Sequence, residues 1–363
     1  MKKFSDYRYF PSIRTRQSEL EGVSNIGEST KSKFLPVVSL TKLKGRQDAD
    51  SAIDKWFDSF NNESIIEISN DPVLKCIDSD SLYLSDKHCS NWIDFLKNQK
   101  GKYNKIIPAA IFHKDLGQRD YVKQLEKLES YFGRFVVKIN PLKSHELLAA
   151  TMAASVVDDI SNVLFILDVG QIDSSRQDLC LDATIRGINM LRNIDPRIEI
   201  VSSGTSFPRT FAEYGKESGA ISMLEWQNYL AVGGEKIALY GDAASIHGEF
   251  YPGSYAKFVA RIDYPTPGVW RFERRSGSDQ RDELYQLAAK DIVTDEGWDD
   301  SLEVWGTEII KSVSEGNVNR FKSPSKWISV RVNLHIERMI RFIENGVLSH
   351  INDDDTDEYN SVE

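Results

Sequence analysis

The sequence predicts an α/β protein built as a single (β/α)8 barrel of the TIM type, with a β-hairpin inserted after the eighth strand and extra helices at the C-terminal end. Three observations lead to this prediction. Short apolar runs typical of strands buried on both faces recur as far as residue 242. A helical pattern follows each run, so strands and helices alternate. Eight such strands favour a closed parallel barrel, because closure leaves no strand edge unpaired.

The alternative fold is an open doubly wound α/β sheet. Such sheets often bind dinucleotides through a Gly-x-Gly-x-x-Gly turn after a strand. No such turn follows any predicted strand of this chain. The barrel is therefore the preferred prediction.

The strands are predicted from apolar runs bounded by turn residues. The clearest covers 162–171, which is apolar almost without a break and too short for a typical helix. Pro11 lies near the start of the first run, a position where a strand tolerates proline. The turn Asn70-Asp71-Pro72 ends the third run. The eight predicted strands are 9–15, 34–40, 64–69, 106–112, 134–139, 162–171, 198–204 and 237–242.

The helices between them are predicted from apolar spacing and cap residues. Ile53, Trp56 and Phe60 recur at helical spacing, and Ser144 is a suitable N-cap. The sequence Ser222-Met-Leu-Glu225 has the spacing of a capping box, so 222–232 is predicted as a helix and not as an additional strand. The predicted helices are 17–26, 48–60, 90–98, 118–132, 144–157, 175–194 and 222–232.

The alternation ends after the eighth strand. Residues 257–275 are predicted to form a β-hairpin around Pro-Thr-Pro-Gly. Because the hairpin follows the eighth strand, it is predicted to lie over the C-terminal mouth of the barrel. The helix 280–292 is predicted to close the barrel, and helices 301–314 and 325–345 follow it. The predicted segments are the barrel over 1–245, the hairpin insertion over 246–280, the closing and C-terminal helices over 281–346 and a disordered acidic tail over 347–363.

The composition is that of an ordinary globular protein with a formal net charge of −10. Six of these negative charges lie in the last eleven residues, so the rest of the chain is only mildly acidic and broad electrostatic binding to nucleic acid is not expected. No apolar run approaches the roughly 20 residues of a membrane span, and the first residues lack the apolar segment of a secretory signal. We therefore expect a cytoplasmic protein. The three cysteines, Cys76, Cys89 and Cys180, share no metal-ligand spacing and are expected to be reduced and structural.

Several short motifs in order along the chain resemble the phage Beta protein family. They are Tyr9-x-Pro11-x-x-Arg14 with Glu19-Leu20, Phe34-Leu35-Pro36-Val37-Val38, Tyr240-Gly241-Asp242, Ala260-Arg261-Ile262-Asp263-Tyr264 with Trp270, Ser325-Lys326-Trp327 and His335. The resemblance implies a barrel-like cytoplasmic protein of phages, satellite elements and bacterial islands, often encoded near abortive-infection or toxin-type genes. It implies no reaction. The chain departs from the pattern at Ala243, where the family tends to an aromatic residue.

In a parallel barrel, functional residues gather at the C-terminal ends of the strands. A mixture of cations and carboxylates is expected at this mouth, with cations in excess, and such a mixture suits an anionic ligand such as a phosphate or a nucleotide. The residues expected at the strand ends are Arg14, Arg16, Lys42, Asn70, Asp71, His113, Lys114, Lys138, Asn140, Asp168, Ser202, Ser203, Thr205 and Asp242, and the hairpin adds Arg261, Tyr264 and Arg271.

Three residues are candidates for catalysis. Asp168 and Asp242 end the sixth and eighth strands and could share acid and base roles or bind one divalent cation. The alternative is that each carboxylate pairs with Arg14, Arg261 or Lys138 in a structural network. Lys138 could act as a Schiff-base nucleophile if burial lowered its pKa, although a salt-bridged interior lysine is the simpler interpretation. No metal site is predicted, and the sequence does not indicate a cofactor.

Other polar groups have a functional and a structural interpretation. The sequence Ser202-Ser203-Gly204-Thr205 could cradle a phosphate, but a polar strand end is favoured. His335, on a mostly apolar helix, is expected to be a hydrogen-bonded core residue. A basic cluster near the C-terminus is interpreted as the solvated rim of a helix and not as a nucleic-acid patch. The cluster comprises Arg320, Lys322, Lys326, Arg331, Arg338 and Arg341.

These observations leave two hypotheses for function. The first is a phage or island accessory protein in anti-phage defence or toxin neutralisation, which binds a partner encoded nearby or a ligand at the mouth. The second is a barrel enzyme, a hydrolase or lyase, acting on a phosphorylated or nucleotide-like substrate, with Asp168 and Asp242 as the reacting carboxylates. Nucleic-acid and membrane partners are not expected. The predicted ligand-binding residues are Arg14, Arg16, Ser202, Ser203, Arg261, Tyr264 and Arg271.

Overall fold

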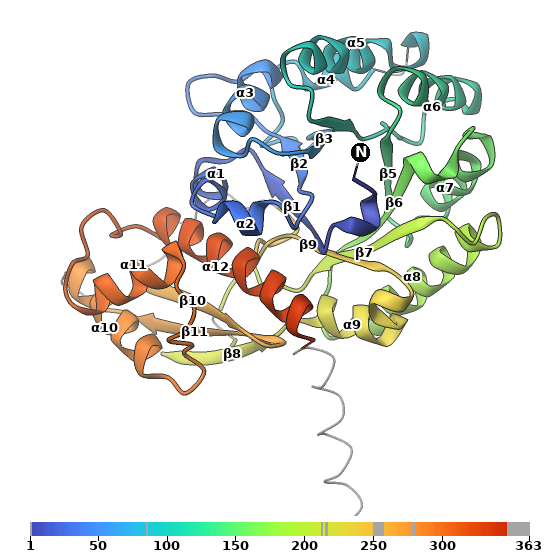
Figure 1. The fold of residues 1–363 in the computed structure, drawn as a ribbon. Coiled ribbons are helices and arrows are strands. Elements are labelled where there is room, and N and C mark those ends of the chain that lie inside the picture. Colours follow the sequence, from blue (N-terminus) through green and yellow to red (C-terminus); the bar gives the residue numbers. More distant parts are fainter. Residues whose placement is uncertain are drawn as a thin grey trace, which may run out of the picture.

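Eight parallel strands form a nearly closed barrel in the computed structural model, which describes residues 2–84, 86–211, 213–214, 217–249, 258–277 and 280–346. The strands follow the order β4-β3-β2-β1-β9-β7-β6-β5, and a parallel bridge between Ala109 and Val136 joins the two ends (Figure 1). The barrel strands are β1 (Tyr9–Arg14), β2 (Val37–Leu40), β3 (Ser64–Ile68), β4 (Ile106–Pro108), β5 (Phe135–Ile139), β6 (Val163–Gln171), β7 (Glu199–Thr205) and β9 (Leu239–Asp242). The predicted barrel is confirmed.

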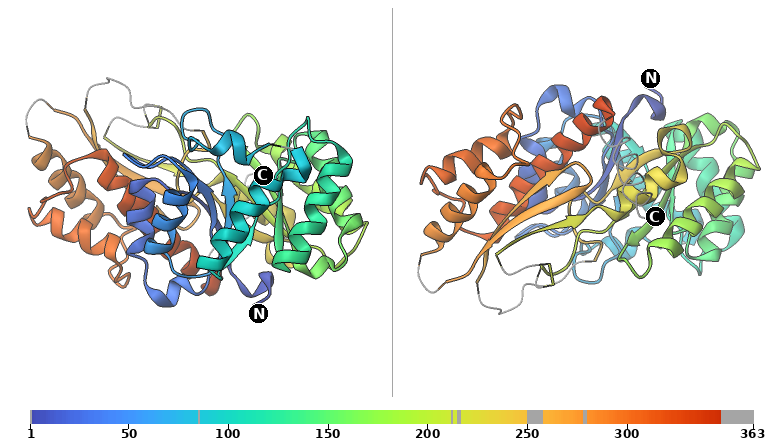
Figure 2. Two further views of the ribbon diagram at one scale, coloured as in Figure 1. Left: turned by 90° about the horizontal axis from the view of Figure 1, so that it is seen from above. Right: turned by 90° about the horizontal axis from the view of Figure 1, so that it is seen from below.

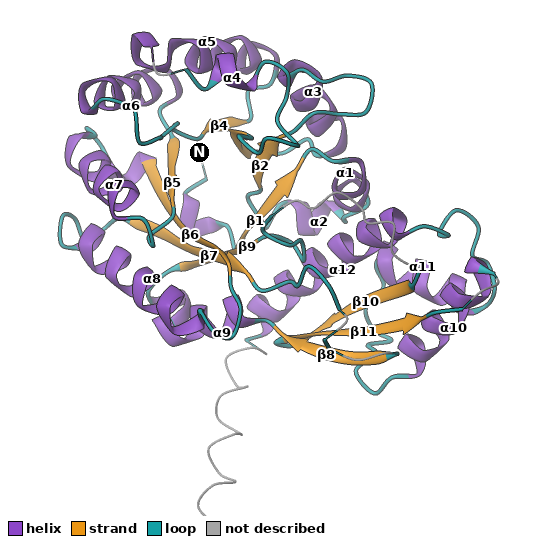
Figure 3. Cartoon of the chain, turned by 180° about the vertical axis from the view of Figure 1, so that it is seen from behind, coloured by secondary structure: helices purple, strands orange, loops and turns teal. Residues whose placement is uncertain are grey.

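Helices cover the outside of the barrel, as Figure 3 shows. Asp48 caps the helix that follows β2 by accepting a hydrogen bond from the Ser51 N–H, and Gly133 ends the helix after β4 in a conformation with positive φ. The helices of this layer are α1 (Gln17–Ser24), α2 (Glu28–Lys31), α3 (Ala49–Ser59), α4 (Ser79–Leu82), α5 (Asp86–Lys102), α6 (Gln118–Phe132), α7 (Ser144–Val156), α8 (Gln177–Arg192) and α9 (Leu224–Val232).

A second, antiparallel sheet lies beside the barrel, in the order β10-β11-β8. The hairpin of β10 (Ala260–Thr266) and β11 (Val269–Arg275) matches the sequence prediction. The third strand, β8 (Ser218–Ser222), was not predicted. The predicted capping box is wrong, because Ser222 pairs with Val269 in the sheet and Met223 takes the N-cap position of α9.

Three C-terminal helices follow the hairpin: α10 (Arg281–Thr294), α11 (Trp305–Ser314) and α12 (Pro324–Asn345). The helix predicted to close the barrel corresponds to α10, but α10 packs against α11, β10 and β11. The helix that packs beside the first barrel elements is instead α12, which contacts α1 and β1 on one side and β10 on the other. Hence the hairpin predicted over the mouth is found beside the barrel, as the two views of Figure 2 show.

The helices α1 and α12 approach closely at Gly22. A Cβ built there would lie 2.7 Å from the Ser329 carbonyl oxygen, so a larger residue would push the helices apart.

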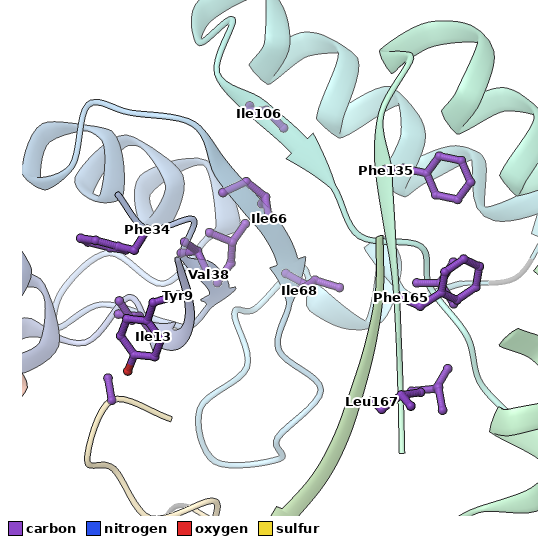
Figure 4. Packing of buried hydrophobic residues seen from close by; sticks show 14 of the residues in the cluster. Tyr9, Ile13, Phe34, Val38, Ile66, Ile68, Ile106, Phe135, Phe165 and Leu167 are labelled. Carbon is purple, nitrogen blue, oxygen red and sulfur yellow. The ribbon is translucent and has the colours of Figure 1, made fainter. Parts of the chain in front are cut away.

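The main hydrophobic core lies between the strands and the outer helices, where Phe34, Phe135 and Phe165 are fully buried (Figure 4). A separate apolar cluster fills the barrel interior and includes Phe4 and Tyr7. Phe4 is the first residue of the 3-10 helix Phe4–Asp6 (η1) and Tyr7 directly follows it, so the N-terminal segment packs into the barrel.

The predicted acidic tail, 347–363, lies outside the described residues. All three cysteines are buried and none forms a disulfide. None of the described helices combines the length and apolar character needed to cross a membrane.

Candidate functional site at the barrel mouth

Two adjoining cavities lie at the C-terminal ends of the barrel strands. Their volumes are about 220 and 310 Å³. Both are lined by Glu67, Lys138, Asp168 and Gly170, so these residues stand between the two cavities. The position is the usual one for a functional site in this fold.

The centre of the mouth is an ion triad from three strands: Glu67 from β3, Lys138 from β5 and Asp168 from β6. Lys138 Nζ lies 3.2 Å from Glu67 Oε1 and 3.4 Å from Asp168 Oδ2. Burial lowers the pKa of Lys138, but the two carboxylates outweigh burial and the pKa is raised. The lysine is therefore held as a cation, which favours the salt-bridged interpretation over the Schiff-base nucleophile.

Arg14, at the end of β1, holds the segment that follows β9. Its Nη2 donates to the carbonyl oxygens of His247 and Gly248, at 3.0 and 2.9 Å. The N–H of Gly248 donates to Oε1 of Gln171 at 2.9 Å. The guanidinium of Arg14 thus positions part of the cavity wall.

Asp242, at the end of β9, is buried in a hydrogen-bonded network. Its carboxylate accepts from the hydroxyls of Tyr9 and Tyr240, and Nε2 of His335 lies 2.7 Å from Oδ2. The N–H of Ala244 also donates to Oδ1. Burial alone would raise the pKa of Asp242, but His335 and the hydroxyl donors reverse this effect and the pKa is lowered.

The predicted core role of His335 is confirmed, because the residue is 0% exposed and hydrogen-bonded. Asp168 pairs with Lys138, one of the cations considered for it, whereas Asp242 has His335 as its partner and none of the three predicted cations. The two aspartates therefore differ in environment: Asp168 is partly exposed at the cavity and Asp242 is almost fully buried.

Sequence reasoning missed a buried acid next to this network. Glu225 of α9 accepts hydrogen bonds from the N–H and the hydroxyl of Ser206. Burial, and then repulsion from Asp242, raise the pKa of Glu225 to about 8. Its only sequence signal is an acidic residue within an otherwise apolar and aromatic stretch, Met223 to Trp226.

The predicted ligand-binding residues are divided between different places. Arg14 and Ser203 line the first cavity. Tyr264 and Arg271 lie in the second sheet, where Tyr264 stacks on Trp298 and Arg271 pairs with Asp295. Arg261 pairs with Asp263 in the same sheet. The second sheet packs beside the barrel, and this separates the hairpin residues from the strand ends.

The remaining strand-end residues are also divided. Asp71 and Thr205 line the first cavity, and Asn140 lines the second. The described lining of the two cavities does not include Arg16, Lys42, Asn70, His113, Lys114 or Ser202.

The charge balance of the mouth differs from the one that the sequence predicted. Among the described lining residues of the two cavities, two are cations, Arg14 and Lys138. The carboxylates are more numerous: Glu19, Glu67, Asp71, Glu146, Asp168 and Asp242. A site with this balance suits a ligand group that carries positive charge better than a phosphate.

The basic cluster near the C-terminus does not form one solvated rim, so that interpretation is corrected. Lys326 pairs with Glu21 and Lys322 with Asp282 near the surface. Arg331 and Arg338, by contrast, are only 4% and 5% exposed. The cluster is therefore split between the surface and the interior by the packing of α12 between the barrel and the second sheet.

Comparison with known proteins identifies a family and a relative that match most of the chain. The family model described as Beta protein matches residues 9–341. Protein beta of Enterobacteria phage P4 is 30% identical over 345 residues, which make up 94% of this chain and 95% of the phage protein.

Proposed function

Because the chain belongs to the Beta protein family, we propose that it is a phage-associated accessory protein that acts in the conflict between phage and host. Its role in this conflict is defence or toxin neutralisation. It acts by binding a positively charged group of a partner protein at the barrel mouth. The observation that carries this proposal is the excess of carboxylates around the two adjoining cavities.

The ion triad is the proposed binding element. Lys138 is shared by Glu67 and Asp168 at 3.2 and 3.4 Å, and all three side chains are about one-fifth exposed. A lysine or arginine side chain of a partner can compete with Lys138 for these carboxylates, because charged hydrogen bonds strengthen where water is excluded. Toxin neutralisation would follow if the captured side chain is needed for the toxin's activity.

The enzyme hypothesis receives less support. Asp242, one of its two reacting carboxylates, already accepts hydrogen bonds from three side chains and a backbone N–H. The other, Asp168, pairs with Lys138. A phosphorylated substrate would also meet more carboxylates than cations at this mouth.

The test replaces the whole triad, with the variant Glu67→Gln, Lys138→Met, Asp168→Asn. Replacing all members leaves no buried charge unpaired, so we expect the fold to persist. The variant and the wild type are compared for phage plating efficiency in the natural host and for proteins that co-purify from that host. We expect the variant to lose its effect on plating and to lose a stoichiometric partner.

The matched control is Asp58→Asn, which removes a carboxylate whose side chain is 70% exposed and which is not among the described lining residues of the two cavities. This variant should behave as the wild type. An unchanged plating effect and an unchanged partner in the folded triad variant would refute mouth binding.

A further inference from the structure

A separate cavity lies outside the barrel, between the second sheet, the segment after β7 and the start of α12. Its volume is about 250 Å³. We call it the arginine pocket, because its lining includes Arg209, Arg261, Arg274 and Arg331, with Asp263 as the carboxylate among the described lining residues. Its charge balance is the reverse of that at the barrel mouth.

Two guanidinium groups of the arginine pocket share one carboxylate. Arg261 Nε lies 3.0 Å from Asp263 Oδ1, and Arg331 Nη1 lies 2.7 Å from Oδ2. The Asp263 and Arg331 side chains are 3% and 5% exposed. Glu19 also acts electrostatically on Arg331, but within the described lining of the arginine pocket four arginines face one carboxylate, so positive charge remains in a place with little water. Burial accordingly lowers the pKa of Arg331 to about 10, although Asp263 acts in the opposite direction.

The two arginines are held in place by aromatic rings. Arg331 lies 4.1 Å from the ring centre of Phe207, and Arg261 lies 3.7 Å from that of Phe211. Stacking of this type fixes the plane of a guanidinium and leaves its N–H edge available for hydrogen bonding. The arginines are thus oriented by the protein itself.

One buried acceptor of this lining, Oδ1 of Asp263, has no hydrogen bond within the described residues, although Arg261 Nε lies 3.0 Å from it. Two buried donors of the lining also have no hydrogen-bond partner among the described residues: Nε of Arg331 and the hydroxyl of Tyr285. Both residues are more than nine-tenths buried, at 4% and 0% exposure. Buried polar groups in folded proteins almost always have a partner. An acceptor supplied from outside the chain would satisfy both donors.

We propose that the arginine pocket binds a small phosphorylated molecule. Guanidinium groups match phosphate oxygens with paired hydrogen bonds, and a phosphate dianion would compensate the positive charge left by the shared Asp263. The volume lies slightly below the roughly 300–1,000 Å³ of drug-sized sites, which suits a phosphate group with a small remainder. This site is independent of the barrel mouth and of the function proposed for it.

Isothermal titration of the full chain with inorganic phosphate and with pyrophosphate tests the proposal. The wild type should bind pyrophosphate, and Arg261→Gln and Arg274→Gln should each weaken binding at least tenfold. Arg261 is partly exposed and Arg274 lies on the hairpin, so both variants are expected to fold. Circular dichroism and the melting temperature check this expectation.

Two controls separate this site from the rest of the molecule. Arg341→Gln changes an arginine of α12 outside the arginine pocket and should bind as the wild type does. The triad variant of the barrel mouth should also keep the affinity for pyrophosphate.

The proposal would be overturned by no binding of phosphate or pyrophosphate by the wild type, by equal weakening in Arg341→Gln, or by full affinity in a folded Arg261→Gln, Arg274→Gln double variant. Tighter binding of a short single-stranded RNA, lost in the same two variants, would replace the small molecule with a nucleic acid and overturn the assigned ligand class.

Discussion

The barrel mouth and the arginine pocket are both lined by charged side chains, but they compensate these charges differently. At the mouth, Lys138 lies between two carboxylates and the Asp242 carboxylate is surrounded by hydrogen-bond donors. In the arginine pocket, Asp263 serves both Arg261 and Arg331. The mouth therefore has negative charge available for a ligand, and the arginine pocket has positive charge. Two sites of opposite preference in one chain suggest two different binding partners.

The largest effect is expected for Asp242→Asn, which tests whether the innermost carboxylate of the mouth is structural. The amide would meet three side-chain groups and an N–H that now surround a carboxylate. Breaking a buried pair by removing one partner costs about 3–5 kcal/mol, so the free energy of unfolding should fall by this amount. Urea denaturation measures the change, with the exposed Asp58→Asn as the control. A loss of ligand binding without a loss of stability would assign Asp242 to the site instead.

A pH-dependent effect is expected from Glu225, the acid behind the mouth. Its pKa is about 8 in the folded chain against an ordinary value of 4.5. Between these pH values the unfolded chain has lost a proton that the folded chain keeps. Stability should therefore fall as the pH rises from about 4.5 to about 8, by at most roughly 1.4 kcal/mol per pH unit.

The variant Glu225→Gln should flatten this dependence, because its side chain does not titrate. Denaturation midpoints at several pH values in this window provide the measurement. Glu235→Gln changes an exposed glutamate nearby and should keep the wild-type slope. If the slope survives in Glu225→Gln, another group causes it.

The smallest effect is expected for Arg271→Gln, which separates the second sheet from the mouth. Arg271 pairs with Asp295 at 3.0 Å and with Glu296 at 3.3 Å, and its side chain is 34% exposed. Partly exposed ion pairs contribute about 0.2–1 kcal/mol, so the variant should lose no more than this. Thermal unfolding measures the loss. Because the triad is intact in Arg271→Gln, this variant should co-purify with the same partner protein as the wild type. Loss of the partner protein in this variant would support the ligand-binding role that the sequence predicted for Arg271.

The order of strands and helices could be read from the sequence with few errors. Apolar periodicity, turn residues and caps are local properties, and they located all eight barrel strands and the hairpin. The main error, at Ser222, also has a local cause: the capping-box spacing was present, but the residue is held in β8 by pairing with Val269, which follows 47 positions later in the chain.

The candidate sites were only partly predictable. The pairing of Asp168 with Lys138 could be anticipated, because both residues lie at ends of neighbouring parallel strands, β5 and β6. The partner of Asp242 could not be, because His335 comes from a helix 93 positions away. Arg261 was expected at the mouth with Arg14, but the structure places it with Arg331.

The sequence by itself determined the family, the alternation of strands and helices, and the set of charged residues available for function. The tertiary structure decided which of these charges meet. The docking of α12 between the barrel and the second sheet brings His335 to Asp242 and Arg331 to Asp263. The physical reason is one of range: periodicity and capping act over a few residues, whereas charge compensation depends on contacts between segments far apart in the chain.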